Sequence, residues 1–287
     1  MIRALFGASD FRRKLKSDIM ISLTALATLI ALVPLFLVLG YLLTKGVASL
    51  NLNFFTQIPK PVGEQGGGMA NAIVGTFELV GMACAIGVPV GIGAGLYVAE
   101  HPAHATARAI RFAADIMLGV PSIVVGIFAY AIVVRPMHGF SALAGSFALA
   151  IIMIPLVTRT TEEMIKLVPG ELREAALALG APRWRTSLSV VMRTAMTGIA
   201  TGVILAIARI AGETAPLLFT AFGNQYWSTS VTQPIASLTV QVYTFAISPF
   251  ADWQRQAWAG ALVLTCIVLT LEIGVRWVTR GAARVPR

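Results

Sequence analysis

The chain has 287 residues and a formal net charge of +9, with 57% hydrophobic and only 12% charged residues. Soluble domains carry roughly 25% charged residues, and a mean hydropathy of +0.80 is typical of a chain embedded in lipid. These values exclude an ordinary soluble enzyme. They also exclude a nucleic-acid-binding protein, because the basic residues form no cluster on a polar domain.

The first 69 residues begin with a basic tail followed by an apolar run, Ile19–Leu43. This run is much longer than the roughly 7–15-residue core of a secretory signal, so we expect an uncleaved membrane span. A turn-rich segment follows, with Pro59, Pro61 and three consecutive glycines at 66–68. We therefore predict that residues 1–69 comprise a cytoplasmic tail, an accessory first transmembrane helix and an external loop.

Five further apolar runs reach about 18 residues or more, the length needed to cross a bilayer core. They are Asn71–Ala99, Phe112–Val134, Ser141–Thr158, Thr194–Ala221 and Ala257–Val275. The predicted fold class is an all-α membrane protein with six transmembrane helices.

Two of these spans contain residues that suggest how the helices pack. Gly87, Gly91, Gly93 and Gly95 in the second span are small residues near four-residue spacing, which favours close helix approach. Pro121 in the third span predicts a bend whose freed carbonyls need partners inside the bundle. In the same span, Arg111 and Asp115 have the i,i+4 spacing expected of a helix-surface ion pair.

The sequence predicts no metal site, no cofactor and no enzymatic activity. His101 and His104 lie beside Glu100, but Pro102 between them and the lack of a further well-placed ligand argue against zinc. Both cysteines fall inside predicted spans and read as packing residues. A Walker A loop is absent from the sequence, so any ATP hydrolysis would occur on another subunit.

A polar, helix-forming segment, Glu174–Thr186, lies between the fourth and fifth spans. Glu174, Ala175 and Ala176 favour helix, Gly180 supplies a stop, and the proline at 182 suits the start of a second helix. Arg183 then adds a cation next to a tryptophan. This pattern predicts a helix–turn–helix that fits a groove on a soluble partner; a plain solvated loop is the alternative.

The fifth span contains a charged pair, Arg209 and Glu213, next to Gly212 and Pro216. Arg209 follows Arg193 by 16 residues, about 24 Å along a helix, which places it near the middle of the span. A charge inside a span is costly and indicates function by default, and Pro216 weakens the helix beside it. We interpret the pair as part of a substrate path; an ion pair that only joins helices is the alternative.

The basic residues predict the orientation, since Lys and Arg concentrate in cytoplasmic loops. With the N-terminus inside, 17 of the 22 basic residues fall on the inner side. The outer side holds four: Lys45, Lys60, Arg135 and Arg255. Both termini are therefore expected in the cytoplasm.

The polar segment also carries a family resemblance. Glu174-Ala175-Ala176, three residues, Gly180, nine residues and then Val190-Val191-Met192 resemble the "EAA" loop of importer-type ABC permeases, although the proline that closes the family pattern is replaced by Arg193. The stretches Ala208–Thr220, Asn224–Ser228 and Gln233–Leu238 are similar to permease subunits of phosphate importers (the PstA type).

This resemblance implies a permease domain at 70–275, a cytoplasmic coupling loop at about 159–193 and a basic tail at 276–287. It further implies a bacterial inner-membrane heterodimer with a second related permease, two cytoplasmic ATPase subunits and an external phosphate-binding protein. Sulfate, molybdate or phosphonate remain alternative substrates. An ion-coupled secondary transporter and a scaffold subunit are the alternatives from other classes.

Overall fold

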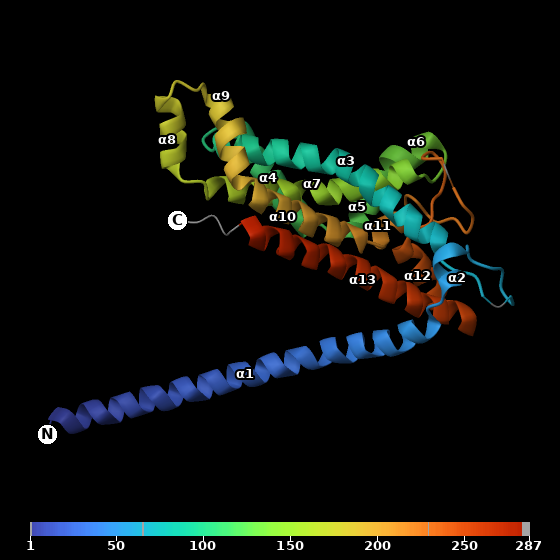
Figure 1. Ribbon diagram of the computed structural model, residues 1–287, viewed down its shortest axis with the longest axis horizontal. Helices are drawn as coiled ribbons and strands as arrows, with labels where there is room; N and C mark the ends of the chain where they lie inside the picture. The colour runs from blue at the N-terminus through green and yellow to red at the C-terminus, as the bar shows by residue number, and fades with distance from the viewer. Residues whose placement is uncertain (1, 65, 229, 283–287) are drawn as a thin grey trace.

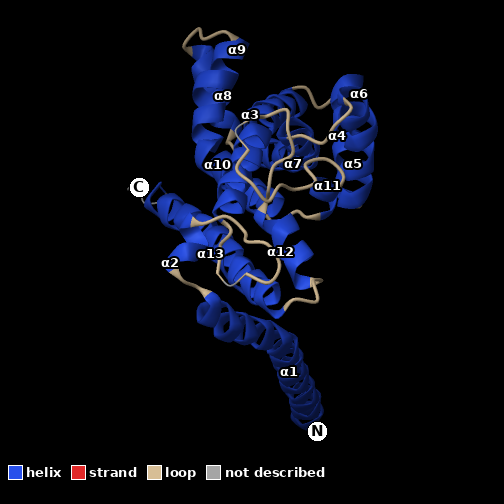
Figure 2. Cartoon of the chain, turned by 90° about the vertical axis from the view of Figure 1, so that its right-hand side faces the viewer, coloured by secondary structure: helices blue, strands red, loops and turns tan. Residues whose placement is uncertain are grey.

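The computed structural model describes residues 2–64, 66–228 and 230–282, with side chains described within 13–274. Every regular element in these ranges is a helix (Figure 2). In chain order the elements, with two π-helical segments labelled η, are α1 (Ile2–Ser49), α2 (Leu52–Thr56), α3 (Ala70–Glu100), α4 (Ala105–Gly119), α5 (Ser122–Ala129), η1 (Tyr130–Val134), α6 (Arg135–Met137), α7 (Ala142–Lys166), α8 (Gly170–Ala178), α9 (Arg183–Arg185), η2 (Thr186–Val191), α10 (Met192–Ala211), α11 (Ala215–Leu218), α12 (Leu238–Ala246) and α13 (Ala251–Ala282).

The predicted spans correspond to long apolar helices of the structure, with two modifications, in the third and the fifth span. Five described helices are long and apolar enough to cross a membrane: α1 (from Arg13), α3, α7, α9–α10 together and α13. The residues of the third predicted span form a bent pair instead of one straight helix: α4 and the α5–α6 segment meet at 108°. Residue 121 explains the break: proline lacks the N–H that a continuous helix needs and disfavours helical backbone at Val120, which is extended (φ −73°, ψ 130°).

Helix α7 forms the centre of the bundle and contacts α3, α4, α5, α10 and α11. Its contact with α3 is unusually close. A β-carbon added to Gly91 would lie 2.7 Å from the Val157 Cβ, and one added to Gly95 would lie 2.6 Å from the Thr161 Cβ. The predicted packing role is thus confirmed for these glycines, whereas Gly93 faces open space.

The fifth predicted span is not one continuous helix. Helix α10 ends at Ala211, and a four-residue helix, α11, follows after the break at 212–214. The predicted span Thr194–Ala221 is therefore interrupted after Ala211, beside the position where Pro216 was expected to weaken the helix. Pro216 has no amide hydrogen to donate to the carbonyl of Gly212, so the backbone turns at this point instead of continuing.

Helix α1 stands apart from the rest of the bundle. It meets α13 only near its C-terminal end, where Tyr41 packs edge-to-face on Trp258 with ring centroids 5.0 Å apart, and the two helices then diverge (Figure 1). The start of α1, the end of α13 and the α8–α9 segment lie at one end of the molecule, while α2, α6 and α12 lie at the other (Figure 1).

Candidate functional site

The polar segment 174–186 comprises the second half of α8, a compact turn and α9. Helix α8 ends at Ala178, and Gly180 follows with φ +82°. The amide of Gly180 donates to the Leu177 carbonyl (2.9 Å) and the amide of Ala181 to the Ala176 carbonyl (3.1 Å). These two bonds form the glycine-dependent Schellman cap, which confirms the predicted helix stop at Gly180.

The return arm of this loop differs from the expected second helix. Arg183 begins only a three-residue helix, which continues without a break through η2 into α10. The loop therefore consists of one separate helix, α8, and one arm that extends α10 at its N-terminal end. A force applied to the turn reaches α10 along a continuous helical segment.

The outer surface of the loop exposes two large apolar side chains among polar ones. Leu179 is 89% exposed and Trp184 is 67% exposed, and the predicted contact residues Glu174, Ala175 and Arg183 are exposed as well, with Ala176 half-buried. Exposed apolar patches with a polar rim are a feature of protein interaction surfaces, and here the two exposed apolar side chains lie at the turn between α8 and α9.

The structure brings Arg209 and Glu213 together at the end of α10. The Arg209 Nε lies 4.0 Å from the Glu213 Oε1, with side chains 48% and 17% exposed. This is the outer limit of an ion pair, and among the described residues Arg209 makes no other. An arginine fork that is this exposed and this loosely paired can still bind an anion through its terminal nitrogens.

The helix break beside the pair is held from two sides. A β-carbon on Gly126 of α5 would lie 2.6 Å from the Pro216 Cα, so α5 packs directly against α11. On the other side the Thr239 hydroxyl donates to the Glu213 carbonyl (3.0 Å), and the Leu238 amide donates to the Thr76 hydroxyl (2.8 Å). The carboxylate of Glu213 is consequently carried on a fixed backbone.

A mainly apolar pocket of about 290 Å³ lies near the break, between the segment that follows α11 and helix α12. Its hydrogen-bonding residues are uncharged: Asn224, Gln225, Ser237, Gln241 and Thr244. Phe222 and Phe245 supply much of the apolar wall. Ser237 and Val240 flank Thr239, so the pocket and the Arg209–Glu213 pair share one framework.

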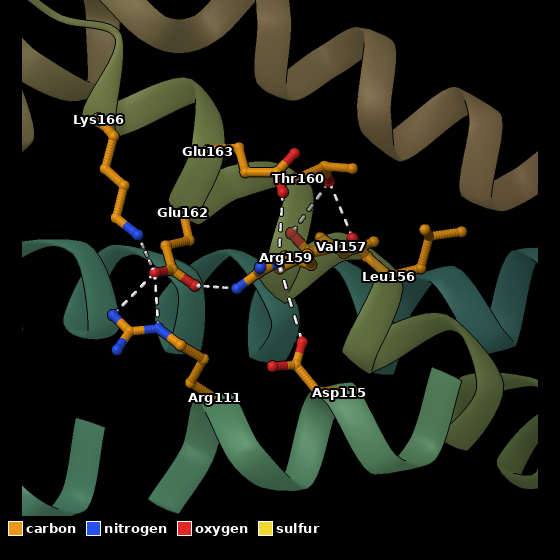
Figure 3. A network of polar contacts seen from close by, with 9 residues as sticks. All are labelled: Arg111, Asp115, Leu156, Val157, Arg159, Thr160, Glu162, Glu163 and Lys166. Carbon is orange, nitrogen blue, oxygen red and sulfur yellow. Dashed lines mark hydrogen bonds and ion pairs between the residues drawn. The ribbon is translucent and has the colours of Figure 1, made fainter. Parts of the chain in front are cut away.

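A second charged cluster lies on α4 and α7 (Figure 3). The carboxylate of Glu162 is 1% exposed and lies 2.8 Å from Arg111 Nη2 and 3.4 Å from Arg159 Nη1, and it also pairs with Lys166. The predicted pairing of Arg111 with Asp115 is wrong. Arg111 reaches across to α7, and Asp115 lies 3.9 Å from Arg159, because the two helices pack side by side and bring these groups into range.

The sequence interpretation missed both carboxylates that organise this end of the bundle, Glu162 and Glu100. Glu162 had a usable signal, since Arg159 and Lys166 lie three and four residues away on the same helix face. Glu100 had none, because its partners Arg173 and Ser187 are more than 70 residues away in the sequence.

Comparison with known proteins gives consistent results. Residues 87–284 match the family "Binding-protein-dependent transport system inner membrane component". The phosphate transport system permease protein PstA of Yersinia pestis is 50% identical over 265 residues, covering 92% of this chain and 90% of that protein. The PstA protein of Haemophilus influenzae is 46% identical (92% and 94% covered), and PstA 1 of Mycobacterium tuberculosis is 34% identical (98% and 94% covered).

Solved structures support the fold. A bacterial ABC transporter that imports the acidic polysaccharide alginate superposes with a TM-score of 0.63 at 13% identity, covering 96% of this chain and 100% of that chain. The inward-facing MetNI methionine ABC transporter gives a TM-score of 0.60 at 16% identity, covering 74% and 96%. At these identities the likeness shows the fold of ABC importer permeases alone. Together with the family match it shows that this chain belongs to the binding-protein-dependent transport system inner membrane components.

Proposed function

We propose that this chain is one permease subunit of an ATP-driven importer that carries inorganic phosphate into the cell. The observation that carries the proposal is Arg209, an exposed and loosely paired arginine at a helix break in a membrane-spanning segment. Broken helices beside charged residues are where transporters build substrate sites. The relatives that cover nine-tenths of the chain are phosphate permeases by name, which supports phosphate over other anions.

The pair gives a physical basis for binding phosphate. The planar fork of Arg209 matches a tetrahedral oxyanion, and its charge offsets part of the cost of bringing an anion into the membrane. Glu213 then supplies selectivity. Near neutral pH, phosphate retains a proton that it can donate to this carboxylate, whereas sulfate has none and meets only repulsion. An unmatched buried polar group discriminates between ligands by orders of magnitude.

Transport would be driven from the apolar loop surface around Leu179 and Trp184. We infer that a cytoplasmic ATPase subunit docks there, with Glu174, Ala175, Ala176, Gly180 and Arg183 in the contact region, and that the chain itself hydrolyses nothing. The exposure of Arg209 in a single chain supports a path formed between this subunit and a second, related permease. An external binding protein would deliver phosphate at the end that holds α12, with both termini in the cytoplasm.

The test uses membrane vesicles that contain the chain with its co-expressed partner subunits. Uptake of radiolabelled phosphate is measured with and without ATP inside the vesicles. Arg209→Gln is expected to abolish uptake, a loss of at least about 100-fold, since a residue that contacts the ion in transit contributes about 3 kcal/mol or more. Arg209→Lys is expected to lose most uptake too, because a point charge does not reproduce the fork.

Yield of the assembled complex serves as the control in this experiment. Normal phosphate uptake by Arg209→Gln would show that the Arg209–Glu213 pair does not contact the transported ion and has only a structural role. Uptake by the wild type that proceeds without ATP would instead indicate an ion-coupled transporter. Equal uptake of sulfate and phosphate by the wild type would contradict the phosphate assignment but keep the importer class.

A further inference from the structure

A single carboxylate at the end of α3 holds both arms of the loop that carries the docking surface. Glu100 is the last residue of α3. One of its oxygens pairs with the guanidinium of Arg173 on α8, and the other accepts a hydrogen bond from the Ser187 hydroxyl in η2 (2.8 Å). Three elements that are far apart in the sequence therefore meet at one side chain.

The same contact connects the loop to the core of the bundle. The Arg173 guanidinium also donates to the Ile165 carbonyl at the end of α7 (3.4 Å). Helix α3 in turn is locked along α7 by the close packing of Gly91 and Gly95. Because α3 and α8 are far apart in the sequence, the contacts of Glu100 are a direct connection through which a displacement of α8 could reach α3.

We propose that Glu100 is a positioning residue for coupling: it makes α8, η2 and α3 move as one unit when the docked ATPase changes shape. This proposal rests on the proposed function, because it assumes that the driving force enters through the loop. It adds a residue outside the loop to the coupling machinery and assigns α3 as a second helix, besides α10, that receives the motion.

Two features separate this role from simple stabilisation of the fold. The Ser187 hydroxyl has a second acceptor, the Arg183 carbonyl at 3.1 Å, so it stays hydrogen-bonded when the carboxylate is removed. Arg173 is partly exposed and water can solvate it. Loss of the Glu100 charge should thus loosen the loop from α3 without unfolding either element.

The experiment compares Glu100→Gln with the wild type in the reconstituted complex, measuring phosphate moved per ATP hydrolysed. We expect this ratio to fall at least about fivefold, the lower range of a coupling free energy between sites, while ATPase binding and complex yield stay unchanged. Glu163→Gln, which removes an exposed carboxylate on α7 at the same end of the bundle, is the matched control and should keep the ratio. The charge swap Glu100→Lys with Arg173→Glu should restore most of it.

A second readout does not depend on the transported anion. Spin labels at Ala178 on α8 and at Gly93 on α3, where an added side chain meets open space, report the loop-to-helix distance in a background lacking Cys84 and Cys266. In the wild type this distance should stay fixed on ATP binding, and in Glu100→Gln it should change. An unchanged ratio or an unchanged distance in Glu100→Gln overturns the proposal. A wild type that keeps the fixed distance but moves no phosphate refutes the proposed function instead.

Discussion

The Glu162 cluster and the Arg209–Glu213 pair are both charged groups within long apolar helices, yet they are built in opposite ways. Glu162 is almost fully buried and its carboxylate contacts three cations on two helices. Arg209 is nearly half exposed and reaches one carboxylate, at 4.0 Å and within its own chain segment. One site is saturated with internal partners and the other is left with unused bonding capacity.

On the proposed function, this difference distinguishes charges that stabilise the fold from charges that contact the transported anion. A buried carboxylate with its oxygens occupied has no capacity left for a ligand, and breaking it leaves uncompensated cations. A weakly paired arginine contributes little to stability and retains donors for an incoming anion. Charge inside a membrane helix is therefore not by itself evidence of a substrate path; the degree to which the protein already satisfies that charge decides its role.

The largest effect that tests this comparison is on folding. Glu162→Gln should lower the free energy of unfolding by about 2–3 kcal/mol, because the charge-assisted bonds to Arg111, Arg159 and Lys166 are lost and these cations repel one another. Denaturant titration of the purified protein in detergent measures this. The control is Glu163→Gln, whose exposed carboxylate should matter by less than about 1 kcal/mol; equal destabilisation by both variants would show that burial of Glu162 is irrelevant.

An intermediate effect is expected on selectivity. Glu213→Gln should narrow the preference for phosphate over sulfate by roughly tenfold, about 1.4 kcal/mol, since the amide can donate a hydrogen bond to either anion. Competition of unlabelled sulfate against radiolabelled phosphate uptake provides the measurement. If the preference for phosphate is retained in full by this variant, discrimination does not occur at Glu213.

The smallest expected effect is the change in stability when the charge of Arg209 is removed. Arg209→Gln should change the free energy of unfolding by less than about 0.5 kcal/mol, because an exposed pair at the distance limit stabilises little, even though uptake is abolished. The same denaturant titration decides the point. A loss as large as that of Glu162→Gln would place Arg209 with the structural charges.

Much of the architecture follows from local sequence. The lengths of the apolar runs predicted α3 to within one residue at each end and located α7 and α13, because a bilayer span needs a minimum number of apolar residues whatever surrounds it. Helices α7 and α13 extend beyond the predicted spans, to Lys166 and over Ala251–Ala282. The turn at Gly180 was predictable for a similar reason: the positive φ of a Schellman cap is a local requirement that glycine meets at low cost. The domain boundaries at 69/70 and 275/276 stay predictions.

Partner choice and exposure were decided only by tertiary structure. From the sequence, Arg111 with Asp115 and Arg209 with Glu213 have the same i,i+4 spacing. In the structure, packing of α4 against α7 brings Arg111 to Glu162 instead, whereas Arg209 and Glu213 stay together as a loose pair at 4.0 Å. The course of the chain after Ala211 and the meeting of Glu100 with Arg173 and Ser187 depend likewise on contacts between distant segments. Spacing along a helix fixes which side chains can reach each other, but the energies of burial and competing partners, which decide what they bind, exist only once the helices are packed.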